Sequence, residues 1–346
     1  MIISSRALKL ACVAVSAVAL AACSGSHHAK QSASAVITPP TPSPTPTKKA
    51  APKLPPAVSP FTGIGKPSTN PVVAVKIDDT ANGRPQVNID KANIVYIEQV
   101  EGGLTRQLAI YNTQLPTVEA VRSTRASDPE LVAQYGPIAY VASGGAPNPL
   151  QVLDQSNLKS SINDRGGPGF ARDGSRSAPY NLTANLALAG QTLKAPRAKS
   201  IGLTWSAAAN LTHRPKGLSV QTVVGGTPVR FDWNAGLHRY VRVIDGAVQR
   251  TASGTLISTP NVIVQFCQVT VYPQDVDVMG NPSQFTHTIG TGKVVVFRNG
   301  HRVDGTWTRP KATSGTTLRT SLGKPLALAP GGAWVVLVAT NAPLTS

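Results

Sequence analysis

The segment Pro71-Val72-Val73-Ala74-Val75-Lys76-Ile77-Asp78-Asp79 decides how the first half of the chain folds. Its valine and isoleucine residues are typical of β-strands, and two aspartates end the apolar run, so residues 71–77 predict a strand. Residues 94–100, 108–111 and 138–142 predict further strands. We therefore expect a sheet in this half of the chain.

Helices are predicted between these strands. A small polar residue directly before a proline is typical of a helix start, and both Asp128-Pro129 and Asn148-Pro149 have this pattern. The first helix is expected to end at Gly136, and a third helix is expected to begin at Asn181 or Thr183. This mixture of strands and helices is typical of an α/β or α+β domain.

The pattern changes from about Gly217 onward, where apolar and polar residues alternate. Residues 229–233 and 238–243 alternate on either side of Asn234-Ala235-Gly236, which predicts a β-hairpin. This part of the chain is expected to be mainly antiparallel β-structure.

Four more strand predictions complete the second half. Asn299-Gly300 is a favoured pair for a two-residue turn, and it joins predicted strands at residues 293–298 and 301–303. Residues 261–272 predict one long strand, and residues 334–338 predict a final buried strand.

The first 22 residues are typical of an export signal. Arg6 and Lys9 form a basic start, and the apolar run over residues 10–22 is shorter than the roughly 20 residues of a membrane span. The run ends in Leu20-Ala21-Ala22-Cys23-Ser24, which predicts cleavage before Cys23 and a lipid anchor on its thiol. A plain signal peptide that ends near a cysteine is the alternative.

A disordered linker is predicted over residues 23–60. Nine of the 29 prolines lie between residues 31 and 60, among threonine, serine, alanine and lysine, a composition that cannot bury apolar surface. The predicted organisation is a signal peptide over 1–22, this linker, an α/β domain with a mixed sheet over 61–200, and a mainly antiparallel β domain over 215–342. The fold class is α+β.

The formal net charge of +17 lies mostly in the second half. Residues 61–190 hold 11 basic and 11 acidic side chains, whereas residues 191–346 hold 16 basic and 5 acidic ones, a net charge of +11. Anionic wall polymers and lipid headgroups are the polyanions expected outside a bacterial membrane, and nucleic acid is not an expected partner. Such polymers would attract a basic face, with an attraction that salt weakens. The alternative is a solvated surface with no dedicated partner.

Most familiar catalytic signatures are absent from the sequence. The six histidines do not have the spacing of a zinc motif. Gly144-Gly145 is not followed by the Gly-Lys-Ser/Thr of a phosphate loop, and Ser143 lacks the Gly-x-Ser-x-Gly setting of a nucleophile elbow. We expect neither a metal nor a cofactor.

Charged residues and glycines gather where the predicted strands of the first half end. If several of these strands share a direction, their loops meet at one rim, where arginines are suited to bind a carboxylate or phosphate. The residues expected to bind a ligand there are Asp78, Glu101, Arg106, Arg122, Arg125, Gly144 and Gly145. The alternative is a set of surface ion pairs and turns that each contribute little.

A series of short motifs resembles the YerB-like lipoproteins, which carry domain of unknown function 3048. In the first half they are Ile77-Asp78-Asp79, Arg84-Pro85-Gln86, Ile94-Val95-Tyr96, Val100-Glu101-Gly102-Gly103-Leu104-Thr105-Arg106, Val121-Arg122-Ser123-Thr124-Arg125, Ser143-Gly144-Gly145 and Arg176-Ser177-Ala178-Pro179-Tyr180-Asn181. In the second half they are Phe231-Asp232-Trp233, Gly290-Thr291-Gly292-Lys293, Gly305-Thr306-Trp307 and Leu328-Ala329-Pro330-Gly331-Gly332-Ala333-Trp334. The last motif of the first series adds Arg176 and Asn181 to the expected binding residues.

The resemblance implies a lipoprotein with two paired domains and implies no reaction. The sequence departs from the family pattern at Asp79, where an asparagine is expected, and at Tyr180, where histidine is common. Either change could alter a site.

We therefore expect an extracytoplasmic, membrane-anchored lipoprotein of the cell envelope that binds an anionic or zwitterionic ligand or acts as a scaffold for it. One alternative is an envelope hydrolase or transferase with Glu98 or Glu101 as general base, although nearby arginines would lower a pKa that this role needs to be raised. Another is a structural partner in a membrane-bound complex. The oligomeric state stays open.

Overall fold

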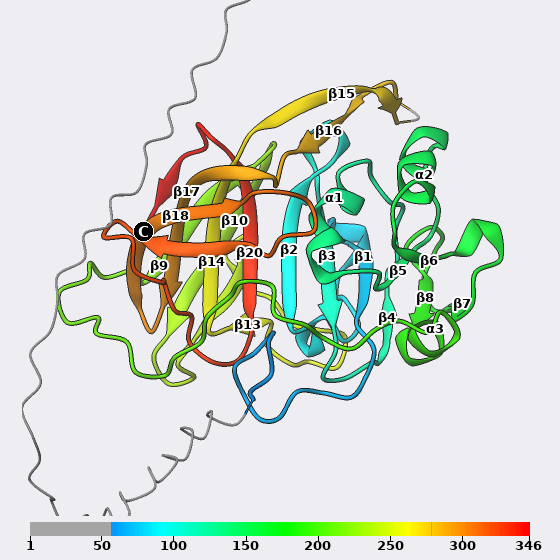
Figure 1. Cartoon of the computed structure of the whole chain (residues 1–346). Helices are drawn as coiled ribbons and strands as arrows, with labels where there is room; N and C mark the ends of the chain where they lie inside the picture. Colours follow the sequence, from blue (N-terminus) through cyan, green and yellow to red (C-terminus); the bar gives the residue numbers. More distant parts are fainter. Residues whose placement is uncertain (1–56, 278) are drawn as a thin grey trace, which may run out of the picture. The chain divides into compact units, whose positions relative to one another are not determined.

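The computed structural model describes residues 57–277 and 279–346 (Figure 1). The predicted signal peptide, Cys23 and most of the predicted linker lie outside these residues. Within the described ranges, no helix combines the length and the apolar composition that a membrane crossing requires.

A ten-stranded mixed sheet runs through the molecule, with five neighbouring strands from each half of the chain. In spatial order the strands are β19 (Thr317–Thr320), β18 (His301–Arg309), β17 (Gly290–Arg298), β14 (Asn261–Cys267), β20 (Ala333–Ala339), β2 (Ile94–Gln99), β3 (Thr105–Tyr111), β1 (Val73–Asp78), β5 (Ala139–Ala142) and β6 (Lys159–Ile162). The halves join where β20 pairs in parallel with β2, from Ala333 beside Ile94 to Val336 beside Ile97. The segments predicted as two domains thus share one sheet within one compact unit.

Both faces of this central sheet are covered (Figure 1). One face packs against a three-stranded sheet, helix α3 (Leu186–Thr192) and a second sheet. The three-stranded sheet contains β4 (Thr117–Glu119), β8 (Leu182–Asn185) and β7 (Phe170–Arg172). The second sheet contains β12 (Ala247–Val248), β11 (Arg239–Ile244), β10 (Thr227–Asn234), β9 (Ser219–Val224) and β21 (Leu344–Thr345), with β13 (Ser258–Thr259) beside β11.

The other face is covered by helices α1 (Asp128–Val132) and α2 (Pro147–Asp154) and by loops. A separate two-stranded ribbon, β15 (Val269–Val276) with β16 (Pro282–Thr286), extends from the second half over the edge where β1 ends and β3 begins (Figure 1).

The mixed and antiparallel sheets agree with the α+β prediction in its broad form. The predicted strands of the first half are present as β1, β2, β3 and β5, and β3 begins three residues earlier than predicted, at Thr105. The predicted hairpin is formed by β10 and β11, with Asn234 paired to Arg239. Asn299 and Gly300 both have positive φ, 50° and 70°, and join β17 to β18 as predicted.

The prediction of one long strand over residues 261–272 is wrong. The chain forms β14 in the central sheet and then leaves it for the ribbon as β15. All residues of β14 are buried, whereas β15 is largely exposed, because the apolar run that suits a sheet covered on both faces ends at Cys267.

The predicted helix starts are also corrected. Leu182–Asn185 is strand β8, because Leu182 and Ala184 pack into the core, and helix α3 follows with Asn185 as its cap. Asp128 begins α1 without capping it, since its carboxylate is buried in an ion pair. Asn148 lies inside α2, and its side chain accepts a hydrogen bond of 2.7 Å from the Tyr272 hydroxyl.

Candidate functional site

A cavity of about 470 Å³ lies at the edge where β1 ends and β3 begins. Its lining from the first half comes from the segments after β1 and β2, the start of β3, the loop before α1, Ala146 and Tyr180. The ribbon adds Asp275, Val276 and Asp277 from the second half. The cavity therefore brings together strand ends of one half and a ribbon of the other.

Arg125 and Glu101 form a closely hydrogen-bonded ion pair in this cavity. The Arg125 Nη2 atom lies 2.5 Å from Glu101 Oε2, and its Nε contacts Oε1. The Ser283 hydroxyl of the ribbon also contacts Glu101 Oε1. Burial alone would raise the pKa of Glu101, but the hydrogen bonds and charge of Arg125 and the Ser283 contact lower it below its usual value.

Arg122 is paired with Asp78 at the end of β1. Its Nη1 atom lies 2.7 Å from Asp78 Oδ2, and its guanidinium stacks 4.9 Å from the centre of the Tyr180 ring. Asp78 Oδ1 accepts a hydrogen bond of 2.6 Å from the Thr80 backbone. Arg122 and Arg125 thus each have a carboxylate partner.

Arg106 differs from these two arginines. It is only 8 % exposed, and its hydrogen bond is from Nη1 to the Ser123 carbonyl at 3.0 Å. No carboxylate of residues 57–277 or 279–346 forms an ion pair with it. Burial and the charges of Arg125 and Arg122 lower the pKa of Arg106 to about 10, so its guanidinium is still charged at neutral pH.

A second charged cluster lies fully buried and does not line the cavity. Lys76 Nζ is 2.7 Å from Asp128 Oδ1 and also contacts Glu98. Asp128 additionally accepts a hydrogen bond of 2.6 Å from Tyr140, and these donors lower its pKa although burial alone would raise it. Burial and the Asp128 charge raise the pKa of Glu98 to about 8. The sequence offered one signal for this cluster, a lysine inside the apolar run of β1.

Asp79 connects the first half of the chain to the second sheet. Its carboxylate accepts hydrogen bonds from Arg242 Nη2 at 2.7 Å, Thr105 at 2.8 Å and Gln107 at 2.8 Å, all buried. The acidic residue that replaces the expected asparagine therefore has an arginine partner.

The predicted ligand-binding residues divide into two groups. Asp78, Glu101, Arg106, Arg122 and Arg125 line the one cavity. Gly144 and Gly145 do not, although the next residue, Ala146, does. A side chain on Gly144 would collide with Asp164 and one on Gly145 with Thr124, so tight packing requires both glycines.

Arg176 and Asn181 lie outside this cavity. Arg176 donates a hydrogen bond of 2.5 Å to the Pro85 carbonyl and lines a neighbouring cavity of about 460 Å³ that shares Tyr180 with the first. Asn181 accepts a hydrogen bond of 2.8 Å from Arg172.

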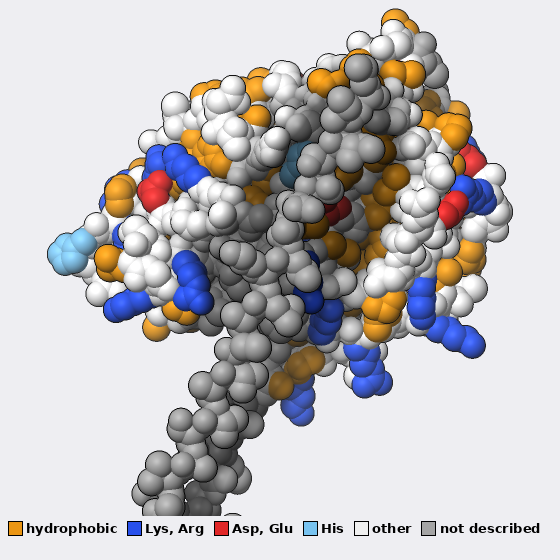
Figure 2. Space-filling model, turned by 45° about the horizontal axis from the view of Figure 1, so that its top comes forward, with side chains coloured by type: hydrophobic (Ala, Val, Ile, Leu, Met, Phe, Trp, Pro, Cys, Tyr) orange, Lys and Arg blue, Asp and Glu red, His pale blue; other side chains and the backbone are white. Residues whose placement is uncertain are grey.

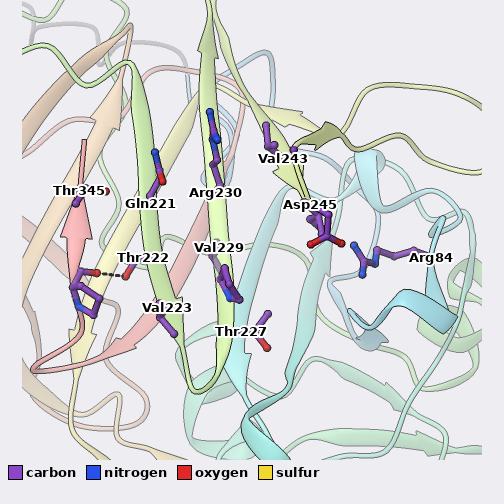
Figure 3. Close-up of a pocket in the computed structure, with 14 residues that line it drawn as sticks. Arg84, Gln221, Thr222, Val223, Thr227, Val229, Arg230, Val243, Asp245 and Thr345 are labelled. Carbon is purple, nitrogen blue, oxygen red and sulfur yellow. Dashed lines mark hydrogen bonds between the residues drawn. The ribbon is translucent and has the colours of Figure 1, made fainter.

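A larger cavity of about 590 Å³ lies on the second sheet (Figure 3). Figure 3 shows Gln221, Arg230 and Val243 on β9 to β11, with Asp245 and Arg84 at one end. Valines, prolines and Ile244 supply much of its lining, and Arg230 is exposed and paired with Asp232. It has no counterpart of the buried Arg106, so the smaller cavity is the stronger candidate for binding a charged ligand.

No group of histidine, cysteine, aspartate and glutamate side chains in the described part of the chain is arranged to hold a metal ion.

Both halves of the chain match a known protein family. Residues 61–199 match the family model described as protein of unknown function (DUF3048) N-terminal domain, and residues 218–335 match the corresponding C-terminal domain. The "Putative lipoprotein YerB" of Bacillus subtilis (strain 168) is 26% identical over 301 residues, which cover 81% of this chain and 86% of that protein. The crystal structure of the YerB protein from Bacillus subtilis has the same fold, with a TM-score of 0.70 and 21% identity over 84% of this chain and 100% of that chain.

Proposed function

Because the chain belongs to the DUF3048 family over both its N-terminal and C-terminal domains, we propose that it is an extracytoplasmic lipoprotein whose cavity binds a ligand with an anionic group. The similarity to the putative lipoprotein YerB supports the proposal that the chain is a lipoprotein. The arginines that line the cavity support the proposal that it binds an anionic group.

The proposed anchor is a lipid on Cys23, within Leu20-Ala21-Ala22-Cys23-Ser24. Metabolic labelling with an alkyne fatty acid tests it, followed by separation of membrane and soluble fractions. Wild-type protein should carry the label and sediment with membranes, and Cys23→Ala should lack the label. Equal labelling of both proteins would contradict the anchor.

The observation that carries the binding proposal is the buried guanidinium of Arg106. It forms no ion pair with a carboxylate of the described residues, and two other guanidiniums lie near it. Burial of an unpaired charge costs several kcal/mol. Nearby like charges add to that cost, and the charges of Glu101 and Asp78 offset part of it. A bound carboxylate or phosphate would neutralise this charge and could form two parallel hydrogen bonds with the planar guanidinium. The free protein is therefore arranged to gain from binding an anion.

The basic second half has a separate role in this proposal. Its net charge of +11 would draw the protein toward anionic wall polymers or lipid headgroups at low salt. The face in Figure 2 shows Lys and Arg side chains standing singly or in small groups around its margin. Attraction spread over such a surface favours loose contact with a polyanion, whereas the cavity would bind one ligand group.

The geometry favours binding over general-base catalysis. Glu101 lines the cavity, but Arg125 lowers its pKa. Glu98 has a raised pKa, but it is buried against Lys76 and does not line the cavity. Neither carboxylate combines the raised pKa and the access to substrate that a general base needs.

Thermal unfolding of the full chain with inorganic phosphate or acetate tests the binding proposal. Either anion should raise the wild-type midpoint by mass action, and Arg106→Met should abolish the rise. Arg302→Met is the matched control, because Arg302 is paired with the largely exposed Asp304, and it should retain the rise. The proposal fails if neither anion moves the wild-type midpoint or if Arg106→Met responds like the control.

A further inference from the structure

We infer that the ligand of this cavity is a zwitterion, with its anionic group on Arg106 and an ammonium group on Asp275. This inference rests on the proposed function and adds the cationic group of the ligand. Asp275 belongs to strand β15 of the ribbon, is 4 % exposed and lines the cavity.

The hydrogen bonds of Ser283 leave the acidic side of the cavity short of donors. The Ser283 hydroxyl has one hydrogen, but it contacts both Glu101 Oε1 and Asp275 Oδ2, the latter at 2.5 Å. Glu101 already has Arg125 as its cation, with a hydrogen bond from Nη2 and with Nε in ion-pair contact. Asp275 has no such cation, and no lysine, arginine or histidine in the described chain forms an ion pair with it.

The charges that line the cavity lead to the same conclusion. Two of its arginines are neutralised by Asp78 and Glu101. Arg106 is then left as an unpaired cation, and Asp275 as an unpaired, buried carboxylate, with Asp277 also in the lining. A ligand with only negative charge would satisfy Arg106 and be repelled by the ribbon. A ligand that also carries an ammonium group would supply Asp275 with up to three N–H donors.

The two poles belong to different parts of the fold. Arg106 is on strand β3 of the central sheet, whereas Asp275 is on the ribbon. A zwitterion bound between them would therefore connect the ribbon to the sheet. The cavity volume of about 470 Å³ falls in the usual range for small-molecule sites. An amine joined to an acid by a short spacer is the ligand class that fits, such as a short peptide or an amino-alcohol phosphate.

Isothermal titration of the full chain in detergent tests this class with matched probes. The dipeptide alanyl-alanine carries both charges, and N-acetyl-alanyl-alanine carries the carboxylate alone. Phosphoethanolamine and glycerol phosphate form the corresponding phosphate pair. We expect the zwitterion of at least one pair to bind about tenfold or more tightly than its partner without the amine, as loss of a charge-assisted hydrogen bond implies. The pair that shows the difference identifies a peptide or a headgroup as the source.

Substitution of Asp275 separates the two proposals. Asp275→Asn keeps the shape of the side chain and should make each zwitterion bind no more tightly than its amine-free partner. The amine-free anion should bind at least as tightly as to the wild type, because one carboxylate that repels it is gone. Asp304→Asn, on an exposed carboxylate, is the control and should leave the tenfold difference intact. In each pair, the wild type could bind the zwitterion and its amine-free partner equally well and lose both with Arg106→Met. That result would overturn the zwitterion proposal and leave the anion site standing. Failure of all four probes to bind would overturn both.

Discussion

The substitution Asp79→Asn tests how much one buried ion pair between the two halves of the chain stabilises the fold. Asp79 is 5 % exposed, and its carboxylate lies 2.7 Å from Arg242 Nη2. The Nε and Nη1 atoms of Arg242 have no hydrogen-bond partner in the described part of the chain, and its guanidinium lies 5.4 Å from the centre of the Trp334 ring. Asparagine would keep an acceptor but remove the charge, so Arg242 would be left buried with a neutral acceptor and the aromatic ring as its only compensation.

We expect Asp79→Asn to lower the free energy of unfolding by about 3–5 kcal/mol, the cost of breaking a buried pair by removing one partner. Asparagine is the residue that the family pattern leads one to expect at this position, so restoring it should harm this chain. The double substitution Asp79→Asn with Arg242→Met should recover most of the loss, because no stranded charge remains.

Urea unfolding, monitored by tryptophan fluorescence, measures this change. The dependence of the unfolding free energy on urea concentration should have the same slope in all variants. Asp304→Asn is the control, since it removes one partner of an ion pair of similar length, 2.8 Å, whose carboxylate is 49 % exposed. An exposed pair contributes up to about 1 kcal/mol. A loss in Asp79→Asn no larger than that in the control would refute the role given to the Arg242 pair.

Two further predictions concern the other buried charges. The pKa of Glu98 is raised from 4.5 to about 8 by burial and by Asp128. Between these two pH values Glu98 is therefore protonated in the folded state and ionised in the unfolded state. Stability should therefore fall as pH rises from about 5 to 8. Glu98→Gln should flatten that fall in urea titrations, and an unchanged slope would contradict the assignment. Arg106→Met should leave the free energy of unfolding unchanged or higher. Arg125→Met should lower it by about 3–5 kcal/mol, because it leaves Glu101 buried without its cation. Equal losses of the two variants in the same assay would count against an unpaired Arg106.

Local sequence patterns predicted the strands and turns well where a single physical rule decides the structure. The valine-rich run of β1 and the pair Asn299-Gly300 are examples, because strand preference and positive φ are properties of those residues themselves. The start predicted for the third helix, at Asn181 or Thr183, was too early, because burial of Leu182 and Ala184 overrode the local helix signal there and α3 begins at Leu186.

The first half of the candidate site could be predicted because charged residues at neighbouring strand ends meet at one edge of a sheet. Asp275 and Ser283 could not be, since no local pattern shows that a ribbon from the second half reaches this cavity. The same holds for the pairing of β20 with β2, which joins residues far apart in the sequence. Arg106 was among the predicted residues, but its lack of a carboxylate partner is a property of the folded molecule alone.

The most direct test of an anion site at Arg106 is a crystal of the protein soaked in bromide, with the anion located by its anomalous scattering. The unpaired guanidinium should hold a bromide ion in hydrogen-bond contact, and the same soak of Arg106→Met should lose that peak. Peaks at exposed arginines such as Arg230 would serve as the internal control for the soak. Bromide at those surface positions with none at Arg106 would contradict the central claim.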